Sequence, residues 1–132
     1  MSDYYKNTPE IIRSGLDSLQ PIIKTTNFGI KVEAAGEYYI DEIFLKAIRP
    51  DRFLSFGIPK YILVETSLVI KPPVFEEALS KLILSGYKPI LAHPERYPFF
   101  SDSMRQYEKI KEMGVFFQLN LLSLTGYYSQ SV

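Results

Sequence analysis

The sequence predicts an α/β domain, because short apolar runs alternate with amphipathic helical segments along the chain. The expected order is strand, helix, strand, helix, strand, at spacings that suit the crossover connections of a parallel sheet. The 132 residues are enough for one domain with a hydrophobic core, and no repeat or linker divides them. We therefore expect residues 1–132 to form a single domain built on a parallel sheet.

The composition excludes several classes of protein. Hydrophobic residues make up 46% of the chain, which excludes disorder, and the 15 acidic side chains balance the 15 basic ones. A balanced charge gives no general attraction to nucleic acid or to anionic lipid. The absence of cysteine excludes disulfides and thiolate zinc sites. With no signal-peptide pattern and no long apolar run, we expect a cytoplasmic protein without a membrane span.

The first third of the chain predicts a helix followed by a strand. A helix is expected over residues 9–20, with Thr8 as its N-cap and a proline at the first helical position. Alternating apolar residues then predict a strand over residues 29–40, in which Glu33 and Glu37 share a face. The apolar stripe of the helix consists of Ile11, Ile12, Leu16 and Leu19.

The rest of the chain continues the alternation of strands and helices. Prolines at the start and glycines at the end delimit the helices most clearly. The expected elements are a helical turn over 44–48, a strand over 61–65, a helix over 73–85, a strand over 89–92, a helix over 102–113 and a strand over 115–119.

Four polar residues stand at or near the carboxyl ends of the expected strands, namely Glu37, Glu65, His93 and Asn120. That edge of a parallel sheet is where α/β proteins bind ligands. Each residue also has a structural alternative: a solvated strand end for Glu37, a turn cap for Glu65, a buried structural imidazole for His93 and a turn former for Asn120. Their common position in the sheet favours a binding site.

Two carboxylates and a neutral imidazole form a mixed ligand set that suits manganese, iron, zinc or magnesium. Close by, the planar guanidinium of Arg96 matches the oxygens of a phosphate, which points to phosphate ester chemistry. The alternative for Arg96 is a surface ion pair with Glu95. Without a cysteine, a glycine-rich phosphate loop or a serine triad, hydrolysis would depend on metal-activated water.

The segment around His93 resembles the signature of bacterial metal-dependent protein-tyrosine phosphatases of the capsular polysaccharide type. These enzymes are a branch of the polymerase and histidinol phosphatase (PHP) superfamily. The resemblance covers essentially the whole chain, and LAHPERY is its most specific part. The matching segments are NTPEIIR (7–13), AGEY (35–38), YILVE (61–65), PILAHPERY (89–97), QLN (118–120) and SLTGYY (123–128).

This resemblance implies a partial (βα) barrel of the PHP type, with a metal cluster, usually of manganese or iron, at the carboxyl ends of its strands. Glu37, with Glu33 as an alternative, Glu65 and His93 would be metal ligands. Arg96 would hold the substrate phosphate and stabilise the charge on its oxygens. The implied substrate is a phosphotyrosine protein, such as a bacterial tyrosine kinase that controls capsule or exopolysaccharide synthesis.

The chain also departs from the family pattern, because His93 is its only histidine. The family's His-x-His and Asp-x-His pairs do not occur in it, so we expect the middle part of a longer phosphatase domain, with part of a site and no useful activity alone. Open strand edges of a partial barrel predict a homo-oligomer.

Two other functions remain open at the sequence level. One is a noncatalytic module that binds phosphotyrosine or a kinase tail through the aromatic segments 97–100 and 127–128, for which core packing is the alternative. The other is a PHP-type phosphatase acting on a small phosphate ester.

Overall fold

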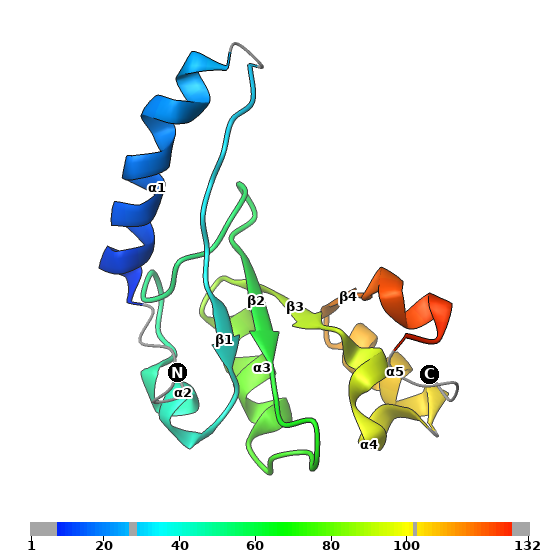
Figure 1. The fold of residues 1–132 in the computed structure, drawn as a ribbon. Coiled ribbons are helices and arrows are strands. Elements are labelled where there is room, and N and C mark those ends of the chain that lie inside the picture. Colours follow the sequence, from blue (N-terminus) through cyan, green and yellow to red (C-terminus); the bar gives the residue numbers. More distant parts are fainter. Residues whose placement is uncertain (1–7, 27–28, 102, 128–132) are drawn as a thin grey trace.

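The architecture is a four-stranded parallel sheet with helices packed against it (Figure 1). The computed structural model describes residues 8–26, 29–101 and 103–127. The strands follow chain order across the sheet, and helical segments connect each strand to the next. The α/β class and the parallel sheet predicted from the sequence are confirmed. The strands are β1 (Glu37–Tyr39), β2 (Tyr61–Glu65), β3 (Lys88–Ala92) and β4 (Phe116–Gln118).

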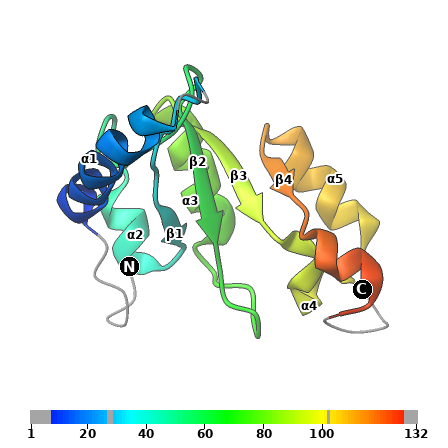
Figure 2. The ribbon, with the colours of Figure 1, turned by 45° about the horizontal axis from the view of Figure 1, so that its top comes forward.

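Helices cover one face of the sheet, and the strands fan out in a curved sheet that is open at β1 and at β4 among the described residues (Figure 2). Ile62 and Val64 of β2 are buried in one hydrophobic core with Phe75 and Leu79 of the third helix. The helices are α1 (Pro9–Thr25), α2 (Glu42–Ala47), α3 (Phe75–Leu84), α4 (Pro98–Ser101) and α5 (Met104–Glu112), and the 3-10 helices are η1 (Pro94–Arg96) and η2 (Leu121–Thr125).

The prediction of a strand over residues 29–40 is wrong except for its last part, because only Glu37–Tyr39 pairs with β2. Residues 29–36 run as irregular chain beside α1, where the side-chain amide of Gln20 donates to the carbonyl of Val32 at 3.2 Å. An alternating pattern produces a strand only where a partner strand supplies hydrogen bonds, and no described strand lies beside residues 29–36.

The predicted capping residue of the first helix is confirmed, but the helix ends later than predicted. The hydroxyl of Thr8 caps α1 by accepting from the N–H of Ile11 at 3.3 Å, as predicted, but α1 continues through Pro21 to Thr25 rather than ending near residue 20. Helix α4 was not predicted. The expected start of α5 at Asp102 lies outside the described residues.

Two apolar surfaces lack cover in the described part of the chain. Helix α1 contains no buried residue, and Ile11 and Ile22 are 56% and 62% exposed. In Figure 1 this helix stands to one side of the sheet. The sheet face opposite the core carries Leu63, Ile90 and Phe116 side by side, and Phe116 is 47% exposed. None of the described helices is both long and apolar enough to cross a membrane.

Candidate metal centre

The sheet brings Glu37, Glu65 and His93 together from three neighbouring strands. Glu65 is the last residue of β2, and His93 directly follows β3, as the sequence predicts. Glu37 was expected at the carboxyl end of its strand but is the first residue of β1. It still reaches the site because β1 is short and pairs Tyr39 with Glu65, so that Glu37 lies on the same sheet face two residues away.

The three side chains converge closely. His93 Nε2 lies 3.7 Å from Glu37 Oε1 and 3.7 Å from Glu65 Oε2. One ligand atom from each residue lies within 4.8 Å of the others. Asn120, the fourth candidate, precedes η2, and its backbone N–H donates to Glu95 at 3.3 Å.

The geometry of the group fits a divalent cation. An ion about 2.0–2.2 Å from each ligand holds neighbouring ligand atoms about 3–3.5 Å apart, close to the observed 3.7 Å. The imidazole is largely buried, yet its Nδ1 has no hydrogen-bond partner and its Nε2 stands too far from both carboxylates for a hydrogen bond. The Nε2 atom and the two carboxylates therefore face one another at a spacing that leaves room for an ion between them.

The electrostatics of the group also favour a cation. Partial burial raises the pKa of Glu37 above its ordinary value, and repulsion by the Glu65 carboxylate raises it further, while His93 opposes the shift. The two carboxylates therefore lie close enough to repel each other. A bound cation would offset this repulsion.

His93 adopts an unusual backbone conformation. Its φ of 33° and ψ of 54° lie in the left-handed region, which a residue with a β-carbon rarely occupies. The turn directs the chain from β3 into η1, while the N–H of His93 donates to the carbonyl of Gln118 at 2.7 Å. The imidazole is thus fixed at the strand end by β4 and by the start of η1.

Arg96 ends η1, three residues after His93, and is half-buried. Burial raises the pKa of Tyr97, and the positive charge of the neighbouring Arg96 opposes that shift. Tyr97 is fully buried, and its ring centroid lies 5.6 Å from that of His93. Arg96 therefore belongs to the same strand-end region as His93.

Glu33 and Glu95, the other two carboxylates considered in the sequence, have partners of their own. Glu33, the alternative to Glu37, lies outside the group: its carboxylate pairs with Lys31 and accepts from the N–H of Gly57. Glu95, suggested as a surface partner for Arg96, uses Oε1 to accept from Asn120 and Ser123.

The aromatic segments 97–100 and 127–128 do not form one exposed surface. Tyr97 and Phe100 are fully buried, whereas Tyr127 is 72% exposed and Tyr128 lies outside the described residues. The first segment therefore packs in the core.

Sequence reasoning did not find the residues that support the site, which are Thr66, Glu95 and Ser123. Thr66 is buried directly after Glu65, and its N–H donates to the hydroxyl of Tyr97 at 3.2 Å. The only sequence signal for Glu95 was its place inside the LAHPERY segment. No local pattern marked Thr66 or Ser123.

Taken together, a parallel α/β sheet with carboxylates and an imidazole at its ligand-binding edge defines a candidate metal-dependent domain. The comparisons with known proteins agree with this class. Residues 1–132 match the family described as "Capsular polysaccharide synthesis, CpsB/CapC", and the chain belongs to this family. The resemblance found in the sequence is thereby confirmed.

Relatives in this family are tyrosine-protein phosphatases by name. YwqE of Bacillus subtilis is 27% identical over 128 residues, which cover 97% of this chain and 50% of YwqE. CpsB of Streptococcus agalactiae is 25% identical over 91 residues, 69% of this chain and 37% of CpsB. The chain thus spans half or less of the length of these relatives.

A solved structure shows the same fold. The match, from crystal structures of YwqE and Streptococcus pneumoniae CpsB described as "unique metal-dependent tyrosine phosphatases", has a TM-score of 0.75 and 29% sequence identity. It covers 96% of this chain and 51% of the matched chain. The PHP-type partial barrel expected from the sequence is confirmed by this similarity.

Proposed function

We propose that this chain carries part of the active site of a metal-dependent protein-tyrosine phosphatase in capsular or exopolysaccharide biosynthesis. The observation that carries the proposal is the convergence of Glu37, Glu65 and His93, whose ligand atoms lie within 4.8 Å of one another. Membership in the CpsB/CapC family and the names of its relatives support the reaction class.

In this proposal Glu37, Glu65 and His93 hold a divalent cation, with manganese as the first choice and iron, zinc or magnesium as alternatives. When bound, the cation supplies positive charge that polarises a phosphoryl oxygen and makes water more acidic. Arg96 binds and orients the phosphate through its planar fork and stabilises the charge that develops on the phosphate oxygens. The ring of the buried Tyr97 packs near the imidazole of His93, with 5.6 Å between the ring centroids.

The proposed substrate is a phosphotyrosine protein, with a bacterial tyrosine kinase as the candidate partner and the cytoplasm as the place of action. We also propose that the three residues supply only part of the ligand set, so that efficient turnover needs further ligands.

Association between copies is part of the same proposal. The open edges at β1 and β4 and the uncovered apolar residues of the sheet and α1 favour pairing with another chain. Light scattering coupled to size-exclusion chromatography should find a homo-oligomer. A monomer at micromolar concentration would contradict this part.

The test of the metal site is elemental analysis after equilibration with Mn²⁺, combined with turnover of a phosphotyrosine peptide and p-nitrophenyl phosphate. Wild type is compared with Glu65→Ala, His93→Ala and the exposed control Glu108→Ala. We expect close to one ion per chain in wild type and the control, and loss of the ion in the other two variants. Absence of metal from wild type would overturn the proposal.

Comparing the phosphotyrosine peptide with small phosphate esters distinguishes the proposed function from the two alternatives. Turnover of small esters without turnover of the peptide would replace the substrate class by a small phosphate ester. Peptide binding that is equal with and without metal would instead favour a noncatalytic interaction module.

A further inference from the structure

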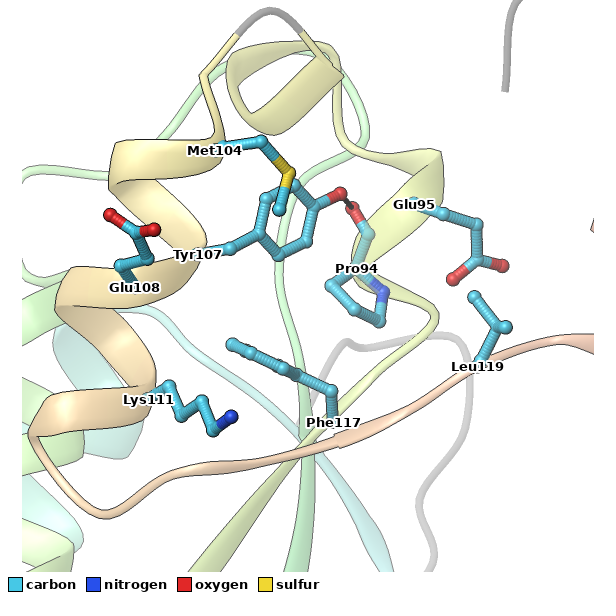
Figure 3. A pocket seen from close by; sticks show the side chains of 8 residues that line it. All are labelled: Pro94, Glu95, Met104, Tyr107, Glu108, Lys111, Phe117 and Leu119. Atoms are coloured by element: carbon cyan, nitrogen blue, oxygen red, sulfur yellow. Dashed lines mark hydrogen bonds between the residues drawn. The ribbon is translucent and has the colours of Figure 1, made fainter.

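Glu95 links the loop that carries His93 and Arg96 to the loop that follows β4. Its Oε1 accepts a hydrogen bond from the hydroxyl of Ser123 at 2.7 Å and another from the N–H of Asn120 at 3.3 Å. Ser123 lies 28 positions further along the chain. Figure 3 shows the Glu95 carboxylate pointing from η1 toward the segment that carries Leu119.

The same short segment is held from its other side. The hydroxyl of Tyr107 in α5 donates to the carbonyl of Pro94 at 3.3 Å, the contact drawn in Figure 3. Within the turn, the N–H of Arg96 donates to the carbonyl of His93 at 3.0 Å. The position of His93 and Arg96 therefore depends on contacts made by the two residues between them.

The environment of Glu95 is costly for a carboxylate. Ser123 is 3% exposed, and the second oxygen of Glu95, Oε2, is buried without a hydrogen-bond partner. Burial of a charged oxygen without a partner opposes folding. A charged acceptor also makes stronger hydrogen bonds than a neutral one, so the contacts with Ser123 and Asn120 hold the two loops firmly.

We infer that Glu95 is a positioning residue that holds η1 against the start of η2, and thereby sets the place of His93 and Arg96 relative to Glu37 and Glu65. The inference rests on the proposed function for its metal readout. Outer-sphere contacts of this kind orient ligands and typically change metal affinity by about 10- to 100-fold when they are removed.

The first measurement does not involve metal. Amide hydrogen exchange of the metal-free chain is compared among wild type, Glu95→Ala, Glu95→Gln and Ser123→Ala. Glu95→Ala should make the amides of His93, Arg96 and Asn120 exchange about tenfold faster. Glu95→Gln keeps an acceptor oxygen for both donors and should restore most of the protection. Unchanged exchange in Glu95→Ala would overturn the inference.

The second measurement is Mn²⁺ affinity by isothermal titration calorimetry. Glu95→Ala should bind about tenfold more weakly than wild type, with Glu95→Gln close to wild type. Glu108→Ala, which removes an exposed carboxylate from the opposite side of the pocket in Figure 3, is the matched control and should bind normally. Binding is measured where urea denaturation shows Glu95→Ala to be fully folded, so that weaker binding there reports the position of the ligands and not loss of the fold.

The two measurements separate the possible failures. If wild type does not bind Mn²⁺, the proposed function fails, and the exchange data still decide whether Glu95 fixes the loop. If wild type binds Mn²⁺ and Glu95→Ala binds it equally well, the positioning role is wrong while the proposed metal site stands.

Discussion

The hydroxyl of Tyr97 accepts a hydrogen bond from the backbone N–H of Thr66 at 3.2 Å, across a separation of 31 positions. Thr66 directly follows Glu65, and Tyr97 directly follows Arg96. The bond therefore joins the strand end that carries a carboxylate to the loop that carries the phosphate-binding candidate. Both partners are buried, so the contact is shielded from water.

Replacement of Tyr97 by phenylalanine should destabilise the chain by about 1–3 kcal/mol, because the buried N–H of Thr66 would lose its acceptor. Urea denaturation of the metal-free chain measures this change. Tyr61→Phe is the control, since the described contacts of the Tyr61 side chain are ring contacts with Phe56 and Phe116. Equal stability of Tyr97→Phe and wild type would show that the bond contributes little.

Alkaline pH should destabilise wild type more than Tyr97→Phe. Burial raises the pKa of Tyr97 from 10.0 to about 12. The phenol therefore ionises first in the unfolded chain, so its contribution to stability is complete below pH 10 and is lost as the pH rises toward 12. Denaturation midpoints between pH 9 and pH 11 (about the range in which the unfolded phenol titrates) should converge for the two proteins. Parallel pH profiles would contradict this assignment.

Replacement of Glu37 by glutamine should stabilise the metal-free chain at pH 7 while weakening metal binding. The pKa of Glu37 is raised above its ordinary value in the folded chain, mainly by burial. The folded state therefore favours the protonated acid, and the associated stability is lost as the pH rises through the folded pKa. Glutamine removes the charge that causes this loss.

Thermal melts of wild type and Glu37→Gln at neutral and acidic pH test this prediction in the absence of metal. The melting temperature of the variant should exceed that of wild type at pH 7, and the difference should shrink as the pH falls toward 4.5 and below. Mn²⁺ titrations should show the opposite order of affinity. A variant that is less stable at pH 7 would mean that repulsion and burial do not dominate at Glu37.

Replacement of Arg96 by alanine should weaken binding of inorganic phosphate by about tenfold or more, whereas Arg96→Lys should recover only part of the loss. Lysine keeps the positive charge but lacks the planar fork that binds two oxygens at once. Calorimetric titration with phosphate in the presence of Mn²⁺ measures both variants. Metal content should stay at the wild-type level, since Arg96 is not one of the three ligand candidates.

The backbone at His93 provides a further prediction. Its φ of 33° suits glycine better than a residue with a β-carbon. His93→Gly should therefore be about 1 kcal/mol more stable than His93→Ala by chemical denaturation, although both variants lack the imidazole. Equal stability of the two variants would show that the local conformation relaxes freely.

The sequence predicted the parts of the site that depend on strand ends. Glu65 and His93 follow compact apolar runs, and such runs become buried strands wherever they lie. Glu37 was expected in a strand that was predicted too long, because alternation does not reveal whether a partner strand is present. The contact between Glu95 and Ser123 could not be predicted, since it depends on how η1 and η2 are placed by the complete sheet.

The left-handed backbone conformation at position 93 is best suited to glycine, whereas the proposed metal site requires the imidazole of His93. A search for more stable variants of this chain, whether by computation or by selection for heat resistance, should favour glycine or asparagine at position 93. Such versions would fold better and lose the only imidazole in the sequence. Engineering for stability should therefore hold position 93 fixed and seek its gains at the exposed apolar residues of α1.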